Sequence, residues 1–339
     1  MTERARIVCF GELLLRLSAP DGERLMQSPT LVVHVGGSEA NVAVSLARFG
    51  HDAAIVSVVP DNELGAAAIA EMRRHGVATD GIARGPGRMG LYFLTPGAVS
   101  RPASVLYDRA GSAFALAGPG ADDWASALSG ASWLNLSGIT SALGEQAAAA
   151  NRRAASEAAS RGIPVAFDCN YRKQLWATSG GDARRTLHAM LAGARLAFLD
   201  DRDAALILGV QLTGSALERR RAAATAAFSA FPELERVCST IRDVDSVDRQ
   251  RITCVMHTRT RELVSRTHTL DGIVDRVGAG DAFTAGVLHG LVSGHDEQRT
   301  LEVGAAAAAL KHSICGDFNL VDLADVERLA DGPAGDIRR

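Results

Sequence analysis

Asp281 stands in a segment whose residue types suit the binding of an anion, VDRVGAGDAF over 274–283. The small residues Gly278, Ala279 and Gly280 allow a tight backbone turn. Apolar residues then recur at the spacing of one helix face, at Phe283, Val287, Leu288 and Leu291. Amides at a helix start lack intrahelical partners and the helix dipole adds positive charge, so a phosphate or a developing anion can bind there. A carboxylate at this place either caps the helix or takes part in the chemistry, and the segment alone leaves both open.

A second glycine segment lies early in the chain, at Gly36 and Gly37. In one interpretation it is a plain turn, with Ser38 as the cap of an amphipathic helix over 41–49. In the other, the missing side chains let a ligand approach the backbone closely, with Asn41 beside it. The two interpretations are compatible with each other.

The elements that must position these segments alternate along the chain. Strands are predicted over 7–10, 53–59, 133–136, 165–167 and 196–199, and helices over 41–49 and 64–75. The apolar pair Ile273 and Val274 predicts that a further buried strand ends just before the late glycine turn. Strands alternating with helices predict a parallel sheet covered by helices on both faces.

One region breaks this alternation. Between Met89 and Phe114, the strand-like runs 91–94 and 104–107 are separated by the turn residues Pro96 and Gly97, which predicts a hairpin. With 13–18 and 31–35 it could form a small accessory sheet, and such sheets commonly act as lids. We therefore expect an α/β domain over 1–330, a lid built from about 11–35 and 88–116, and a flexible tail over 331–339.

Composition excludes several classes of protein. The chain has 339 residues, 47% of them hydrophobic, and a net charge of −3, so it has material for a large core and no general attraction to nucleic acid or a membrane surface. Its only lysines, Lys173 and Lys311, follow no glycine-rich loop, which excludes a Walker P-loop. The segment after the first predicted strand, CFGE over 9–12, lacks the second glycine of a dinucleotide-binding fingerprint, which disfavours an oxidoreductase.

The cysteines and the N-terminal region favour the cytoplasm. Five scattered cysteines without a C-x-x-C pair argue against a disulfide framework and against a zinc site, and indicate a reducing compartment. The apolar stretch near Cys9 is interrupted by Glu12 and Arg16, so we expect no signal peptide. The longest apolar run, around 305–310, is too short to span a bilayer.

Two motifs resemble the paired signatures of the ribokinase/PfkB family of sugar kinases: GGSEAN over 36–41 and DRVGAGD over 275–281. The resemblance covers roughly residues 5 to 325. Within the family the chain is most similar to 2-keto-3-deoxygluconate kinases, on four further motifs: GLY over 90–92, YDR over 107–109, DCNYR over 168–172 and KHSICGDFN over 311–319.

The resemblance implies a Rossmann-like three-layer α/β domain with a mostly parallel sheet and a β-sheet lid, through which a homodimer or larger homo-oligomer could form. It implies transfer of the γ-phosphoryl group of ATP to a sugar hydroxyl, assisted by Mg²⁺. By position, Asp281 would be the catalytic base, and Gly278, Ala279 and Gly280 would form the anion hole. Gly36, Gly37 and Asn41 would contact the sugar.

Residues on the substrate side are implied by the same motifs. Arg109 and Arg172 are the candidates for recognising a sugar acid, because a guanidinium pairs with a carboxylate through two parallel hydrogen bonds. Arg172 could serve the substrate, the phosphate or both. Tyr92 and Tyr107 would supply hydroxyls from the lid, although ordinary packing is the alternative for them. Asp317 would match a second aspartate on the substrate side, or be a plain loop residue.

Residues on the nucleotide side follow the family pattern less closely. Asp200, Asp201 and Asp203 stand where relatives carry glutamates that position Mg²⁺ and phosphates; they either support the metal indirectly, through Asp203, or cap a helix. The glycine turn that lines the nucleotide pocket of many relatives is replaced by VCSTIR over 237–242. Ser239, Thr240 and Arg242 are therefore only candidates for ATP binding, together with Gly278 and Gly280.

The expected activity is ATP-dependent phosphorylation of 2-keto-3-deoxygluconate to its 6-phosphate. Two alternatives remain. One is a related kinase for a neutral sugar such as fructose or for another acid such as a ketogluconate. The other is a sensor that binds a sugar acid without turnover, although a sensor has no need of the base Asp281. The sequence leaves open the epimer, the nucleotide and the oligomeric state.

Overall fold

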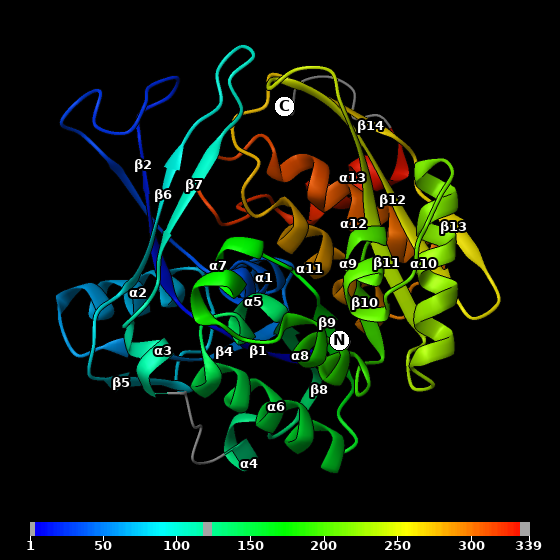
Figure 1. Cartoon of the computed structure of the whole chain (residues 1–339), viewed down its shortest axis with the longest axis horizontal. Helices are drawn as coiled ribbons and strands as arrows, with labels where there is room; N and C mark the ends of the chain where they lie inside the picture. The colour runs from blue at the N-terminus through cyan, green and yellow to red at the C-terminus, as the bar shows by residue number, and fades with distance from the viewer. Residues whose placement is uncertain (1–3, 118–123, 333–339) are drawn as a thin grey trace.

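The computed structural model describes residues 4–117 and 124–332. Its main sheet is built from β1 (Arg6–Phe10), β4 (Asp52–Pro60), β5 (Ile82–Gly85), β8 (Ala131–Ser137), β9 (Val165–Asp168), β10 (Leu196–Phe198), β11 (Arg236–Val244), β12 (Arg249–Thr258), β13 (Glu262–Val264) and β14 (His268–Asp271). The order is β13-β12-β11-β10-β9-β8-β1-β4-β5, with β14 beside β12 (Figure 1). Neighbouring strands from β5 to β11 run parallel, whereas β12 is antiparallel to β11, β13 and β14.

Helices cover both faces of this sheet, as the alternating pattern predicted. One layer holds α1 (Ser38–Arg48), α2 (Glu63–Arg74), α11 (Ala279–Val292), α12 (Glu297–Lys311) and α13 (Leu323–Asp331). The other holds α3 (Ala113–Ala117), α4 (Trp124–Ala127), α5 (Gly138–Ser141), α6 (Glu145–Ser160), α7 (Lys173–Ser179), α8 (Ala183–Leu191), α9 (Asp201–Leu208) and α10 (Ala216–Ala230). Successive side chains of β1 explain the division, because Ile7 and Cys9 pack with the first layer and Val8 and Phe10 with the second. The protein is thus a three-layer α/β fold.

A separate four-stranded sheet stands beside this domain. It consists of β2 (Leu14–Ser18), β3 (Val32–Gly36), β6 (Gly90–Thr95) and β7 (Ser104–Asp108), in the order β3-β2-β6-β7 (Figure 1). The predicted hairpin is confirmed, since β6 and β7 pair antiparallel, and the predicted accessory strands pair with it through β2. The expected flexible tail lies, apart from residues 331 and 332, outside the described residues.

Three local predictions were wrong or incomplete. No strand contains Ile273 and Val274: β14 ends at Asp271, and the backbone amide of Val274 donates to the carbonyl of His312 at the end of α12. Val274 is 58% exposed, so its apolar side chain does not mark a buried strand. Helix α1 begins at Ser38, three residues before the predicted start. The hairpin of β11 and β12, which the alternating pattern did not predict, extends the sheet by an antiparallel edge.

Close packing of α11 against α12 holds the start of α11 in place. The contact depends on two glycines: a Cβ on Gly286 would lie 2.7 Å from the Cα of Gly304 and 3.0 Å from the carbonyl oxygen of Val303. A Cβ on Gly304 would in turn lie 2.9 Å from the side chains of Phe283 and Val287. The helix backbones therefore approach more closely than any side chain would allow. None of the helices within the described ranges combines the length and apolarity needed to cross a membrane.

We expect Gly286→Ala to lower the free energy of unfolding. Overpacking costs about 1–3 kcal/mol, whereas the higher helix propensity of alanine offsets about 1 kcal/mol. Chemical denaturation of both proteins measures the difference. Gly193→Ala is the matched control, since a Cβ there meets no heavy atom within 4 Å. Equal stability of the two variants would contradict this account of the packing.

Candidate active site

An open cleft of about 440 Å³ lies where β9 and β10 end and α11 begins, beside the middle of β11. Its walls include predicted site residues from four different parts of the chain, namely Arg172, Asp203, Ser239, Thr240 and Gly280. The carboxyl ends of parallel strands are where α/β sheets bind ligands. The cleft is therefore the candidate active site.

Asp281 is held by helix α1. Gly278, with φ of 81°, is the N-cap of α11, and Asp281 is the third residue of the helix. Its carboxylate accepts hydrogen bonds from Ser38 Oγ at 2.8 Å and from Asn41 Nδ2 at 2.7 Å. The carboxylate is thus bound to another helix and does not cap its own, so the capping alternative for Asp281 was wrong.

Ser38 likewise has a different role from the one its position suggested. Gly37, with φ of 141°, is the N-cap of α1 and makes no side-chain cap. The Ser38 hydroxyl instead donates to Asp281 and accepts from Asn170 Nδ2 at 2.9 Å. A chain of hydrogen bonds from Asn170 through Ser38 therefore orients the Asp281 carboxylate.

Electrostatics around Asp281 favour a carboxylate that can exchange a proton. Burial raises its pKa above the ordinary range. The hydrogen bonds from Asn41 and Ser38 oppose this rise, as do the positive charges of Arg172 and Lys311. The ionised form of Asp281 is accordingly stabilised by specific side chains of the protein.

Gly278 and Gly280, in the late glycine turn, have different structural roles. A Cβ on Gly278 would collide with the carbonyl oxygen of Asp317, so the missing side chain lets two loops touch. Gly280 is exposed, and a Cβ there would meet no heavy atom within 4 Å. The start of α11 at Gly280 thus borders open space in the cleft, where an anion could bind. Ala279 is buried instead, and its backbone amide donates to the carbonyl of Arg276 at 3.4 Å.

Several predicted substrate residues converge on Asp317, which is 3% exposed. The Tyr92 hydroxyl donates to Asp317 Oδ2 at 2.7 Å, and Gly36 packs so closely on this carboxylate that a Cβ would collide with it. Arg16, from β2, donates to Asp317 Oδ1 at 3.2 Å and pairs with Asp275 at 2.6 Å. Burial raises the pKa of Asp317 to about 6, although Arg16 and Tyr92 lower it.

Arg109 lies buried at the base of the small sheet, with a partner that the sequence did not indicate. Its Nε donates to Glu12 Oε2 at 2.6 Å, and the Ser112 hydroxyl donates to the other oxygen of Glu12. Among the described residues, no hydrogen bond involves the Nη donors of Arg109. The ring of Tyr107 lies 6.5 Å from that of Tyr92 and is half-buried.

Arg172 is exposed on the cleft wall, and within the described residues it forms no ion pair. Its Nη1 donates only to the carbonyl of Tyr171, at 3.1 Å. Its charge nevertheless opposes the rise in the pKa values of Asp168, Asp203 and Asp281. Arg172 is thus a cation beside a group of carboxylates.

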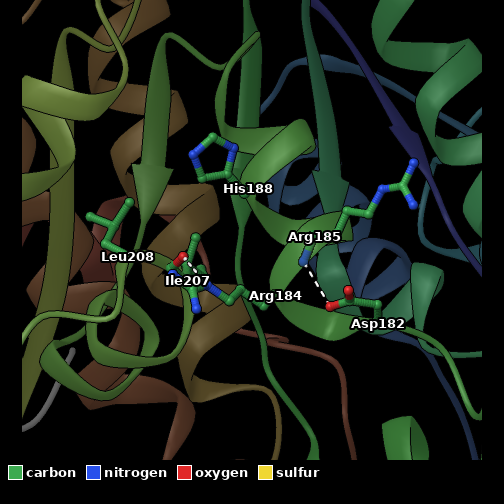
Figure 2. A pocket seen from close by; sticks show the side chains of 6 residues that line it. All are labelled: Asp182, Arg184, Arg185, His188, Ile207 and Leu208. Carbon is green, nitrogen blue, oxygen red and sulfur yellow. Dashed lines mark hydrogen bonds between the residues drawn. The ribbon is translucent and has the colours of Figure 1, made fainter.

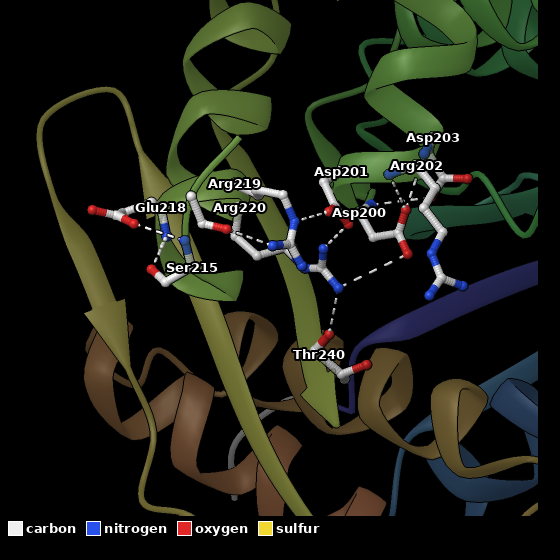
Figure 3. Close-up of polar contacts among 10 residues, drawn as sticks. Asp200, Asp201, Arg202, Asp203, Ser215, Glu218, Arg219, Arg220 and Thr240 are labelled. Carbon is white, nitrogen blue, oxygen red and sulfur yellow. Dashed lines mark hydrogen bonds and ion pairs between the residues drawn. The ribbon is translucent and has the colours of Figure 1, made fainter. Parts of the chain in front are cut away.

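The aspartates at the start of α9 form a capping box (Figure 3). Asp200 Oδ1 accepts from the amides of Arg202 and Asp203, while Asp203 Oδ2 accepts from the Asp200 amide at 3.0 Å. The capping alternative is realised here. Asp203 also lines the cleft, and burial together with the charge of Asp200 raises its pKa to about 8.

Asp201 points away from the cleft toward two arginines of α10. Arg219 Nε donates to it at 2.6 Å, and Arg220 forms a second ion pair with it (Figure 3). Arg220 also donates to the carbonyl of Thr240 at 3.0 Å. This network ties the middle of β11 to α9 and α10, and so fixes one wall of the cleft.

Of the three ATP-binding candidates from the VCSTIR segment, two line the cleft and one does not. Ser239 and Thr240 line the cleft. Arg242 does not line it: its Nη1 donates to Gln250 Oε1 at 3.0 Å and lies 3.3 Å from His312 Nε2. Burial lowers the pKa of Arg242 to about 10.

A second hollow, of about 360 Å³, lies between α8 and α9 (Figure 2). Its walls carry Asp182, Arg184, Arg185 and His188 together with Ile207 and Leu208. Asp182 is the N-cap of α8, and Arg184 donates to the carbonyl of Ile207, so these polar groups serve the helices themselves (Figure 2). No predicted site residue borders this hollow, which therefore is not the candidate site.

Comparison with known proteins gives a consistent result. Residues 4–234 and 267–315 match the pfkB family of carbohydrate kinases. The chain is 34% identical over 333 residues to a 2-dehydro-3-deoxygalactonokinase of Haloferax volcanii, with 98% of each chain covered. It is 28% identical over 323 residues to a 2-dehydro-3-deoxygluconokinase of Thermoproteus tenax, covering 92% of this chain and 89% of that one. A crystal structure of 2-dehydro-3-deoxygluconokinase from Thermotoga maritima superposes with a TM-score of 0.89 at 37% identity, covering 97% of this chain and 100% of that one.

Crowding of the cleft carboxylates should be visible in the pH dependence of stability. Burial and the charge of Asp281 raise the pKa of Asp168 to about 7, above an unfolded value of about 3.9. The folded protein therefore binds this proton more tightly, and stability is lost as the pH rises from about 4 through 7. In the variant Asp168→Asn, the side-chain amide oxygen would keep the hydrogen bond from the backbone amide of Asn170. Because asparagine carries no titrating proton, this part of the stability would not fall as the pH rises.

We therefore expect Asp168→Asn to raise the melting temperature clearly at pH 8 and much less at pH 5, as measured by calorimetry. Asp182→Asn, which changes an exposed cap outside the cleft, is the control and should behave alike at both pH values. If Asp168→Asn raised the melting temperature equally at pH 5 and pH 8, the crowding of the cleft carboxylates would not be the cause of the increase.

Proposed function

The chain belongs to the pfkB family of carbohydrate kinases, and we propose that it transfers the γ-phosphoryl group of ATP to the 6-hydroxyl of 2-dehydro-3-deoxygluconate. The relatives named above support an acid of the 2-dehydro-3-deoxy type as the acceptor. The observation that carries the proposal is the Asp281 carboxylate, held by Ser38 and Asn41 beside the open start of α11. A sugar hydroxyl and a phosphoryl group can meet at this point.

In this mechanism Asp281 takes the proton of the attacking hydroxyl. Its raised pKa brings the carboxylate closer to the basicity that proton transfer near neutral pH requires. The amide of Gly280 stabilises the charge on the transferring phosphoryl group, because Gly280 borders the cleft in the first turn of α11. Arg172 adds a positive charge on the wall of the same cleft.

The residues of the cleft fit Mg²⁺ and a triphosphate. Asp168 and Asp203 supply hard oxygen donors, and their pKa values are raised by burial and by the negative charges of neighbouring aspartates, which a cation would offset. Mg²⁺ bound near them, directly or through water, would neutralise phosphate charge. Ser239 and Thr240 offer hydroxyls on the wall formed by β11.

The carboxylate end of the acid would be recognised from the small sheet. Glu12 fixes the guanidinium of Arg109 through Nε, which leaves the two Nη groups to form a bidentate pair with a ligand carboxylate. Tyr92, Tyr107 and Asp317 would contact the hydroxyls of the sugar. A second candidate substrate is the C4 epimer, 2-dehydro-3-deoxygalactonate, which the Haloferax volcanii relative favours.

The proposal also includes the oligomeric state and the localisation: a homodimer that forms through the small sheet, located in the cytoplasm. Val32, Val33 and Leu106 on this sheet are 41%, 56% and 60% exposed, which leaves apolar surface for a partner sheet. The five cysteines are free, and four of them are buried, as expected for a reducing compartment.

Asp281→Asn tests the mechanism. We expect a loss of roughly 100-fold or more in kcat with little change in KM, because asparagine has nearly the same shape and one acceptor oxygen for Asn41 or Ser38 but takes no proton. A coupled ADP-release assay measures this, and circular dichroism checks the fold. Glu63→Gln in the first turn of α2, outside the cleft, should retain full activity. Near-native turnover by Asp281→Asn would remove Asp281 from the mechanism.

Arg109→Lys tests the choice of substrate. Lysine keeps the charge beside Glu12 and loses the planar pair of donors, so kcat/KM for the sugar acid should fall about 10- to 100-fold, the effect of one charge-assisted contact. The neutral sugar fructose should be affected much less. Assays of both epimeric acids and fructose measure the difference. Equal losses would contradict recognition of an acid, and an absence of ADP release by the wild type with every sugar would favour the non-catalytic sensor.

A further inference from the structure

Three potential metal ligands meet at the far end of α11 from the cleft. They are His289 in the last turn of α11, His295 in the loop after it, and Glu327 on α13. One ring nitrogen of each histidine and a carboxylate oxygen of Glu327 all lie within 4.8 Å of one another. None of these residues belongs to the family motifs or to the candidate active site.

The histidine nitrogens in this cluster are buried and unpartnered. His289 is only 4% exposed, and its Nε2 forms no hydrogen bond within the described residues. Nδ1 of His295 is likewise buried without a partner there. Across the described residues, no hydrogen bond or ion pair involves the Glu327 carboxylate. Buried polar atoms are nearly always satisfied, so two such nitrogens near one carboxylate call for a ligand between them.

His51 orients His289 in the way that metal-bound histidines are usually oriented. His51 Nε2 lies 2.8 Å from His289 Nδ1, so the second ring nitrogen of His289 is held from outside the cluster. When Nδ1 of His289 is the donor in this contact, Nε2 keeps its lone pair for a metal ion.

We propose that His289, His295 and Glu327 form a binding site for a transition-metal dication such as Zn²⁺. Two imidazoles and one carboxylate suit Zn²⁺ and exclude Mg²⁺, which prefers oxygen ligands. Ligand atoms around tetrahedral Zn²⁺ lie about 3.3 Å apart at bond lengths near 2.0–2.1 Å. The ligand atoms in the structure lie within 4.8 Å of one another, and rotation of the half-exposed Glu327 and His295 side chains would bring them to the shorter separation. Water would occupy the fourth position.

The site would be structural. Eight residues separate His289 from Asp281, which is about 12 Å along a helix. The ion would join α13 to α11 and, through His51, to the loop before β4. Arg299 opposes cation binding, because its charge acts on His289, but Arg299 is itself paired with Asp331 at 2.5 Å. We therefore expect the ion to affect stability and not the chemistry in the cleft.

The test is a titration of the chelator-treated protein with Zn²⁺, by calorimetry in buffer without Mg²⁺. We expect one ion per chain and a higher melting temperature with Zn²⁺. Glu327→Gln and His295→Ala should each lower the affinity at least about 10-fold, and abolish most of the thermal shift. With Co²⁺ in place of Zn²⁺, the wild type should show the visible absorption of a four-coordinate ion.

Two controls separate this site from other ligands. Cys315 is exposed, with its Sγ 3.9 Å from His34 Nε2, so Cys315→Ser removes a competing thiol and should leave Zn²⁺ binding unchanged. His188→Ala removes an exposed histidine elsewhere and should also have no effect. The proposal is overturned if Zn²⁺ fails to bind the wild type, if both ligand variants bind it as tightly, or if Cys315→Ser abolishes binding.

Discussion

The candidate site depends on keeping one desolvated carboxylate charged next to ligands that are themselves anionic. Asp281 lies where burial raises its pKa, and two donors from α1 counter that rise, Ser38 and Asn41. The relative position of α1 and α11 is therefore as important as the identity of Asp281. Gly37, whose φ of 141° only glycine adopts easily, lets α1 begin at Ser38 and so brings both donors to the carboxylate.

The small sheet is tied to the same site by a buried ion cluster. Arg16 of β2 is 4% exposed and pairs with Asp275 and Asp317, which belong to loops beside the start of α11 and after α12. Tyr92 of β6 adds a hydrogen bond to Asp317. Buried charges are tolerated only when each has partners, so movement of the small sheet would disturb the predicted substrate residues. The sheet and the substrate pocket are thus mechanically coupled.

The two ends of α11 contrast in their electrostatics. At its start, Asp168, Asp203 and Asp281 are crowded, and the pKa of each is raised, which suits a site that receives cations and phosphate. At its end, two buried histidine nitrogens without hydrogen-bond partners, from His289 and His295, lie near the carboxylate of Glu327. Close packing of Gly286 on Gly304 holds the helix rigid between these ends.

The sequence by itself determined the elements whose patterns are local. Alternating apolar runs indicated the parallel strands and the hairpin, and the glycine turn before a helical pattern indicated an anion site at Gly280 and Asp281. Such features follow from backbone sterics and periodicity, which each segment carries within itself. Only the tertiary structure decided which partners the polar side chains have: Glu12 for Arg109, Arg16 for Asp317, and Ser38 for Asp281. These partners lie from 97 to 301 positions apart along the chain, and no local pattern records a contact that the fold creates between distant segments.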